Sequence, residues 1–402
     1  MIKRLLAVGL CLLLVLAQSA TALADEIDVD LKLDEGLPEA VQVITLAEDS
    51  IPAKSAILMD QQSGRVLFEQ NADEPVAPAS ITKIMTLLLV IEALEEGKIS
   101  LEDKVVTSEL AASMGGSQIW LEPGEEMTVD ELLRAVAIAS ANDASVALAE
   151  HVAGSEPAFI ERMNKRAAQL GMQNTRFLNC TGLDEEGHVT TARDVAIVSR
   201  ELISHPMIIE YSTIWMDELR NGETQLVNTN KLVRFYPGAT GLKTGTTSIA
   251  GSCLSATATR DGLSLVAVVM GAPNSDSRFA AARGLLDYGF ANYVSVTPPS
   301  IADRLTPVKV LHGVKDSVMP VYTSPGNIVV EKELEDKIEQ VITLAEDVQA
   351  PVAMGQVLGT VEIMVDGAVV GSYPLKAGEE IERMTFPRAF AILLKSVLQL
   401  HH

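Results

Sequence analysis

The sequence predicts a mixed α/β domain of the α+β type, followed by a small all-β domain. Five stretches between residues 80 and 204 show helical periodicity, and short strand-like runs precede and follow them. From about residue 301 to 381, β-branched runs alternate with Gly, Pro and Asp turns, which is typical of a small β domain. The length of 402 residues also favours more than one folded unit.

The N-terminus has the three parts of a secretory signal. Lys3 and Arg4 form a charged start, Leu5 to Leu16 an apolar stretch, and Ala22 to Ala24 a small-residue cleavage motif. An uncleaved anchor is the alternative, but the apolar stretch is short for a span of about 20 residues. We therefore expect export and cleavage after residue 24. Residues 25–52 follow as an acidic leader, with nine Asp or Glu against one Lys.

The predicted α+β domain covers residues 53–296. It opens with a hairpin, in which "SAILMD" and "GRVLFEQ" flank a polar turn. Two further strand-like runs, "SCLSATATR" and "LSLVAVVMGA", are split by Asp261-Gly262, and "SRFAAARGLLDYGFANY" closes the domain as a helix. The five helical stretches are 80–96, 129–139, 142–153, 156–170 and 191–204. The β-rich region at 301–381 begins after a composition shift at Thr297-Pro298-Pro299.

The C-terminal segment 384–402 is predicted to be an amphipathic helix. Large apolar residues recur through it, Arg388 and Lys395 interrupt them, and it is too short to span a bilayer comfortably. This pattern fits a helix that lies in the membrane interface. The alternative is a last helix packed on its own domain.

Composition limits the partners and cofactors. The formal charge is −23 and no Lys/Arg block is present, so we expect no nucleic-acid partner. Six histidines without an H-E-x-x-H motif argue against a metal site, and we expect no cofactor. Cys180 and Cys253 remain after signal cleavage; one disulfide is possible, but buried free thiols are favoured.

Ser80 and Lys83 form an S-x-x-K motif at the start of the first helical stretch. Taken alone, the pattern favours a helix N-cap for the serine and a solvent-facing lysine. However, positions three apart share a helix face, so Lys83 can reach the Ser80 hydroxyl. Serine needs a base to become a nucleophile, and lysine is a base only where its charge is disfavoured. A second cation nearby would provide such a site.

Two further motifs complete a known catalytic set. Ser140-Ala141-Asn142 lies at the break between two helical stretches, and Lys243-Thr244-Gly245 lies on a strand-like segment. S-x-x-K, an S-D-N-like triplet and K-T-G occur in this order in penicillin-binding proteins and β-lactamases. In isolation, Lys243 would be interpreted as an exposed strand lysine, and Ser140 and Asn142 as helix caps.

The chain resembles the low-molecular-mass penicillin-binding proteins of the penicillin-binding protein 5 type, which are serine-type D-Ala-D-Ala carboxypeptidases. The resemblance covers roughly residues 53–295 and is carried by "PASITKIMT", "GGSQIWLEPGE", "ASANDASVALAEHVAG", "TGLDEEGHVTTARD", "LVRFYPGATGLKTGTT" and "SRFAAARGLLDYGF". It implies the DD-peptidase/β-lactamase-like transpeptidase fold, with an antiparallel sheet flanked by helices. The sequence departs from the family at Ala141 and Cys180, and neither is a reacting group.

The resemblance also implies the catalytic roles. Ser80 would be the nucleophile and Lys83 its base. Ser140 would relay a proton to the leaving amine, and Asn142 would bind the substrate carbonyl and Lys83. Lys243 would keep Lys83 neutral by its positive potential and help to seat an anionic substrate.

The substrate-binding roles follow in the same way. The backbone N–H groups of Ser80 and Thr246 would form the oxyanion hole, next to Gly245 of the K-T-G motif. Thr244 and Arg278 would hold the C-terminal carboxylate of the substrate. For Arg278 alone, a surface arginine is the alternative, although arginine forks suit carboxylates.

The implied function is removal of the terminal D-alanine from peptidoglycan stem pentapeptides, with β-lactams as acylating inhibitors, at the outer face of the cytoplasmic membrane. A β-lactamase of the same fold or a DD-endopeptidase is the alternative. Between Asn142 and Lys243 lie Glu156, Glu161 and Glu185, but no E-x-x-L-N pattern of a class A β-lactamase. A catalytically silent scaffold would carry damaged motifs, and none is visible. His188 is interpreted as a structural loop residue rather than a catalytic one. Vegetative and sporulation roles both remain open.

Overall fold

The computed structural model describes residues 45–47 and 50–399. The predicted signal peptide at 1–24 lies outside the described residues, as does most of the acidic leader at 25–52. The predicted helix and strand stretches between 53 and 296 are all present, with bounds that differ by a few residues at most.

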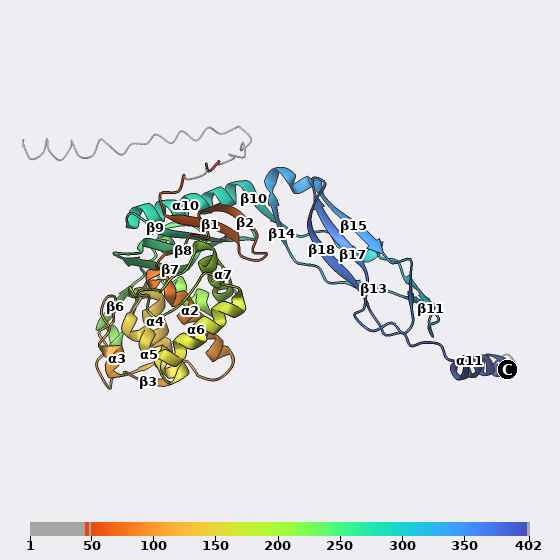
Figure 1. The fold of residues 1–402 in the computed structure, drawn as a ribbon, viewed down its shortest axis with the longest axis horizontal. Helices are drawn as coiled ribbons and strands as arrows, with labels where there is room; N and C mark the ends of the chain where they lie inside the picture. The colour runs from red at the N-terminus through yellow and green to blue at the C-terminus, as the bar shows by residue number, and fades with distance from the viewer. Residues whose placement is uncertain (1–44, 48–49, 400–402) are drawn as a thin grey trace, which may run out of the picture. The chain divides into compact units, whose positions relative to one another are not determined.

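A five-stranded antiparallel sheet forms the centre of the α+β domain (Figure 1). Its order is β2-β1-β9-β8-β7. The bounds are β1 (Ser55–Asp60), β2 (Val66–Gln70), β7 (Ala239–Thr247), β8 (Gly251–Arg260) and β9 (Leu263–Ala272). The N-terminal hairpin therefore joins strands that lie far along the sequence, because β1 pairs with β9.

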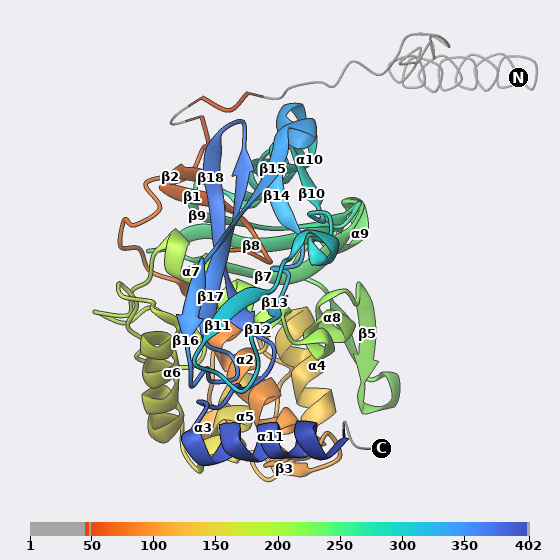
Figure 2. The ribbon, with the colours of Figure 1, turned by 90° about the vertical axis from the view of Figure 1, so that its right-hand side faces the viewer.

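Helices cover both faces of this sheet. The helix α10 (Ser275–Asn292) packs on one face, and α7 (Ala192–Ile203) packs on the other. Figure 2 shows the sheet between α10 and the group of α2, α4 and α5. The bounds of that helical group and its neighbour α6 are α2 (Lys83–Glu95), α4 (Val129–Ala139), α5 (Asn142–Ala153) and α6 (Glu156–Leu170). This arrangement confirms the antiparallel sheet flanked by helices.

The helix α2 lies in the larger of two cores of the α+β domain. Most of its residues are buried, including the run from Lys83 to Leu88. Because the helix is apolar all round, it is surrounded by other elements rather than lying on the surface. Its buried N-terminus carries the S-x-x-K motif.

Several short elements between the predicted stretches were not predicted. They are α3 (Glu109–Ala112), α8 (Pro206–Ser212), α9 (Leu232–Phe235), and the two-stranded sheets of β3 (Lys104–Val106) with β4 (Glu126–Thr128) and of β5 (Met216–Leu219) with β6 (Thr224–Val227). Their strands are only three or four residues long, too short for an alternating pattern to stand out.

The C-terminal region is all β apart from short 3₁₀ turns and its last helix. Strand β10 (Tyr293–Val296) pairs with β14 (Ile328–Glu331), and two further sheets have the orders β12-β11-β16 and β13-β18-β17-β15. Their bounds are β11 (Val308–Leu311), β12 (Ser317–Val318), β13 (Pro320–Tyr322), β15 (Ile338–Leu344), β16 (Asp347–Gln349), β17 (Val357–Val365) and β18 (Ala368–Ala377). The predicted all-β region is confirmed.

The last described element is the helix α11 (Phe386–Gln399). Within the described part of the chain, no helix combines the length and the apolar character needed to cross a membrane. Cys180 and Cys253 are buried free thiols, so the interpretation that they do not pair is confirmed.

Candidate active site

Ser80 lies in a short 3₁₀ helix, η1 (Ala79–Thr82), directly before α2. It does not act as an N-cap: Pro78 precedes η1, Thr82 precedes α2, and neither position makes a side-chain capping bond. The cap interpretation of Ser80 is therefore wrong, and its hydroxyl is available for another contact. Ala79 has a positive φ of 48°, so the backbone is strained immediately before the serine.

Two glycines allow other segments to lie against this strained turn. A Cβ on Gly182 would come within 1.8 Å of the Ala79 carbonyl oxygen, and its φ of +86° also disfavours a side chain. A Cβ on Gly245 would come within 2.9 Å of the Ser80 backbone nitrogen. The loop at 181–187 and strand β7 therefore pack directly on the backbone of this turn.

Lys83 is the centre of the site's hydrogen bonds. Its Nζ donates to Ser80 Oγ at 3.1 Å, to Asn142 Oδ1 at 2.5 Å and to the Thr181 carbonyl at 2.6 Å. The residue is 0% exposed, so the alternative of a solvent-facing lysine is wrong. Burial lowers the pKa of Lys83 to about 7, although the nearby Cys180 and Asp143 oppose the shift. A substantial fraction is therefore neutral at physiological pH.

Ser140 and Asn142 lie where α4 ends and α5 begins. Ser140 has a left-handed conformation with φ of 64°, and Asn142 is the first residue of α5. Asn142 Nδ2 donates to the Gly115 carbonyl at 2.7 Å, which orients Oδ1 toward Lys83. The small residue Ala141 between them is fully buried.

Lys243 and Arg278 add positive charge to the same region. Both are buried, and the pKa of Lys243 lies well below its ordinary value because of burial and the nearby charges of Lys83 and Arg278. The alternatives of an exposed strand lysine and a surface arginine are therefore wrong. Arg278 stays protonated and favours an anionic ligand here, and an anion bound beside Lys243 would in turn favour its ammonium form. Burial is the largest cause of the lowered Lys83 pKa, and the expected influence of Lys243 on it stays a prediction.

Arg278 contacts Thr246 rather than Thr244. Its Nη1 donates to Thr246 Oγ1 at 2.8 Å and to the Gly245 carbonyl at 3.0 Å. Thr244 Oγ1 instead donates to Thr229 Oγ1 at 2.7 Å. Thr244 and Arg278 are therefore not hydrogen-bonded to each other, and Thr246 lies beside the guanidinium. Their expected joint contact with a substrate carboxylate stays a prediction.

Two of the three glutamates considered for a β-lactamase, Glu156 and Glu185, have other partners. Glu156 Oε1 accepts hydrogen bonds from the backbone amide and the thiol of Cys180. Glu185 Oε2 accepts one from Asn179 Nδ2. Neither carboxylate is hydrogen-bonded to Ser80 or Lys83 in the described part of the chain.

Three contributions to the site were not found from the sequence. The Thr181 carbonyl accepts from Lys83, and the Asp143 carboxylate accepts from the backbone of the 119–121 segment. His188 Nε2 lies 3.0 Å from Thr82 Oγ1, which ties the loop before it to the start of α2. Burial lowers the pKa of His188 to about 4, so it is neutral and structural, as interpreted. The sequence blocks that carry the family resemblance contain these residues but give no sign of their contacts.

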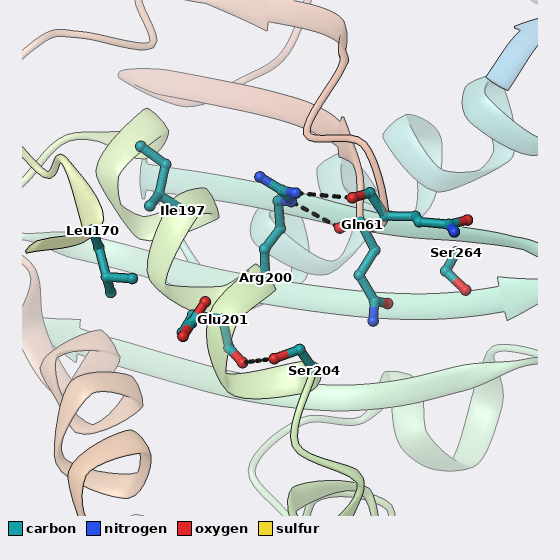
Figure 3. A pocket seen from close by; sticks show the side chains of 8 residues that line it. Gln61, Leu170, Ile197, Arg200, Glu201, Ser204 and Ser264 are labelled. Atoms are coloured by element: carbon teal, nitrogen blue, oxygen red, sulfur yellow. Dashed lines mark hydrogen bonds between the residues drawn. The ribbon is translucent and has the colours of Figure 1, made fainter. Parts of the chain in front are cut away.

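Other clusters lie away from the catalytic motifs. A cavity of 570 Å³ borders α7 and the N-terminal hairpin (Figure 3), but Arg200 within it is bonded to the carbonyls of Gln61 and Gln62. Glu92, Glu201 and His205 lie within metal-ligand reach of one another. Arg166 bonds both carboxylates, so an ion-pair network accounts for that cluster.

Comparison with known proteins identifies the family. A family model described as D-alanyl-D-alanine carboxypeptidase, peptidase S11, matches residues 42–274. A second, described as penicillin-binding protein 5, C-terminal domain, matches residues 297–383. The chain is 45% identical over 339 residues to D-alanyl-D-alanine carboxypeptidase DacF of Bacillus subtilis, and the match covers 83% of this chain and 87% of that protein.

Comparison with solved structures points to the same family. Penicillin-binding protein 5 from Haemophilus influenzae matches with a TM-score of 0.77 and 33% identity, over 84% of this chain and 100% of that one. Penicillin-binding protein D2 from Listeria monocytogenes in the ampicillin-bound form matches with a TM-score of 0.56 and 32% identity. The match covers 61% of this chain and 100% of that one. These matches favour a carboxypeptidase over a β-lactamase. The chain therefore belongs to the peptidase S11 family of D-alanyl-D-alanine carboxypeptidases.

Proposed function

We propose that this carboxypeptidase removes the terminal D-alanine of peptidoglycan stem pentapeptides through an acyl-enzyme on Ser80. One observation carries the proposal: the fully buried Lys83 Nζ lies 3.1 Å from Ser80 Oγ. A neutral amine at hydrogen-bond distance from a serine hydroxyl is a general base for nucleophilic attack. The lowered pKa of Lys83, about 7, supports this role.

In acylation, Ser80 Oγ attacks the carbonyl carbon of the penultimate D-alanine, and its proton passes to Lys83 Nζ. The resulting oxyanion lies between the backbone N–H groups of Ser80 and Thr246, each worth roughly 3–4 kcal/mol in such sites. The C–N bond then breaks, and the proton on Lys83 Nζ passes through Ser140 to the leaving amine, which leaves Lys83 neutral. D-alanine departs and the peptide stays as an ester on Ser80.

In deacylation, a water molecule attacks the ester carbonyl while Lys83 accepts its proton. The ester C–O bond breaks, Ser80 Oγ is reprotonated and the tetrapeptide leaves. The substrate carboxylate would be held by Arg278 with Thr246 and Thr244, and Lys243 would contribute positive potential. Arg278 is buried and stays protonated, which strengthens its attraction for an anion, and a bound carboxylate would favour the ammonium form of Lys243.

β-Lactams are proposed to acylate the same serine. The ampicillin-bound Listeria relative supports this, since its likeness to this chain spans 61% of the chain. No glutamate bonds to Ser80 in the described residues, so we expect the penicilloyl ester to be lost slowly.

Members of this family act on peptidoglycan in the cell envelope. More specifically, we propose export by the N-terminal signal and attachment to the outer face of the cytoplasmic membrane by α11. Phe386, Phe390 and Leu394, spaced four apart on one helix face, are 85%, 57% and 50% exposed. An uncovered apolar stripe on this helix fits the membrane interface.

Membrane attachment is tested with the full chain and phosphatidylethanolamine/phosphatidylglycerol vesicles. A variant carrying Phe386→Ser, Phe390→Ser and Leu394→Ser should sediment with vesicles far less than the wild type. Met354→Ser, at an exposed apolar residue in the β-rich region, is the matched control and should bind normally. Equal sedimentation of all three proteins would contradict the anchor.

The enzymatic proposal is tested by D-alanine release from a muropeptide pentapeptide, followed by mass spectrometry. The wild type should release D-alanine, penicillin should block release, and Ser80→Ala should be inactive. Native release by Ser80→Ala would refute the mechanism. Cleavage of cross-linked dimers at a higher rate than pentapeptides would indicate an endopeptidase instead.

A further inference from the structure

Trp120 is an unusually placed aromatic residue close to the candidate active site. It is 73% exposed, whereas its neighbours Ile119 and Leu121 are 2% and 4% exposed. Its backbone has a positive φ of 61°, which is rare for a bulky residue. Packing does not account for a tryptophan here, because most of its surface is open to solvent.

The backbone beneath Trp120 is held from two sides. The Asp143 carboxylate accepts from the amide of Ile119 at 3.0 Å and from that of Leu121 at 3.1 Å. Arg220 Nη1 donates to the Ile119 carbonyl at 2.8 Å, and its Nη2 donates to the Trp120 carbonyl at 3.4 Å. Asp143 is fully buried, so a group that is costly to bury holds this segment in place. The backbone of this strained turn is therefore held rigidly in place, while the indole of Trp120 is exposed.

The same segment borders the catalytic asparagine. Asn142 Nδ2 donates to the Gly115 carbonyl at 2.7 Å, and the Asn142 backbone N–H donates to the Ser117 carbonyl, also at 2.7 Å. A Cβ on Gly116 would lie 2.9 Å from Asn142 Nδ2 and 3.9 Å from Leu183 Cδ2, so the 181–187 loop meets the segment there. The segment that carries Trp120 therefore borders the catalytic region.

We propose that Trp120 is a specificity-determining residue that contacts the stem peptide on the acyl side of the scissile bond, beyond the penultimate D-alanine. This rests on the proposed function of the Ser80 site. The buried guanidinium of Arg278, bonded to Thr246, suits the D-alanine carboxylate, so Trp120, on a separate segment, is left for the rest of the substrate. The third stem residue is a diamino acid, with an aliphatic side chain that carries an ammonium. An indole face attracts both parts, through apolar contact and a cation–π interaction.

The test compares two substrates in Trp120→Ala, Trp120→Phe and the matched control Met354→Ala, which removes a similarly exposed side chain far along the sequence. One substrate is the pentapeptide L-Ala-γ-D-Glu-L-Lys-D-Ala-D-Ala, and the other is N-acetyl-D-Ala-D-Ala. Trp120→Ala should lower kcat/KM for the pentapeptide about tenfold more than for the short substrate. Trp120→Phe should keep most of the discrimination, and the control should keep all of it.

A second measurement changes the substrate instead of the residue. Acetylation of the pentapeptide's lysine side chain removes its charge and should lower the wild-type kcat/KM several-fold. The effect should be smaller in Trp120→Phe, because tryptophan is the better cation–π partner. Equal losses on both substrates in Trp120→Ala, or no loss on either, would overturn the proposal. Failure of the wild type to release D-alanine would instead refute the proposed function.

Discussion

Lys83 Nζ donates to Asn142 Oδ1 at 2.5 Å, so the lysine of the first motif is held by the asparagine of the second, 59 residues later. The same nitrogen reaches Ser80 and the Thr181 carbonyl. Since Asn142 is fixed by the Gly115 carbonyl, the position of Lys83 depends on a segment outside all three motifs.

Asn142→Asp should impair the base electrostatically. A carboxylate beside Lys83 favours the ammonium form and should raise the pKa of Lys83 by about 1–3 pH units. The acid limb of the penicillin acylation rate should therefore move to higher pH, which a pH series with a fluorescent penicillin measures. Asn142→Ala, which removes the bond without adding charge, should lower the rate about 10- to 100-fold. An unshifted acid limb in Asn142→Asp would contradict the contact.

The wild-type acylation rate should rise with pH through about 7. Because the pKa of Lys83 is lowered to about 7, its neutral, basic form dominates above that pH and falls away below it. Lys83→Arg, which stays protonated, should abolish acylation. A rate that is constant between about pH 5.5 and 8.5 would show that Lys83 is not the titrating base.

Gly245→Ala should damage catalysis more than folding. Its Cβ would lie 2.9 Å from the Ser80 nitrogen and 3.0 Å from the Ile81 nitrogen, so β7 must move away from the nucleophile. We expect acylation to fall about 100-fold, as for loss of an oxyanion donor. Gly284→Ala, in α10 with nothing within 4 Å of the new Cβ, is the control and should acylate normally. Normal acylation by Gly245→Ala would contradict the proposed oxyanion geometry.

His188 should make stability depend on pH. Its folded pKa of about 4 lies below its ordinary value of 6.5, so its contribution is complete above pH 6.5 and is lost as the pH falls toward 4. Between about pH 7.5 and 4.5 the wild type should lose about 2 kcal/mol more unfolding free energy than His188→Gln. Urea unfolding at both pH values measures the difference. Equal losses of unfolding free energy in the wild type and the variant would show that His188 is not a buried neutral histidine.

The sequence predicted the catalytic helices and the sheet because their periodicity is long and regular. The 142–153 stretch, for example, became α5 with the same bounds. The sequence also placed Ser140 at a helix break and Lys243 on a strand. The contact of Arg278 with Thr246 rather than Thr244 could not be predicted, because both threonines lie on the same face of β7 and the sequence does not show which one the guanidinium reaches.

Tertiary contacts explain what the sequence did not predict. The Thr181 carbonyl has no side-chain signature, and Asp143 resembles an ordinary acidic residue at a helix start. Trp120 and Arg220 come together only because a short hairpin returns to a distant loop. This contact joins segments 100 residues apart and leaves no local pattern.

The central claim is that Ser80 is the acylated nucleophile, and peptide mapping after brief exposure to benzylpenicillin tests it most directly. One penicilloyl group should be found, on the peptide that contains Ser80, and Ser80→Ala should carry none. An adduct on another residue, or an unchanged adduct in Ser80→Ala, would contradict the account.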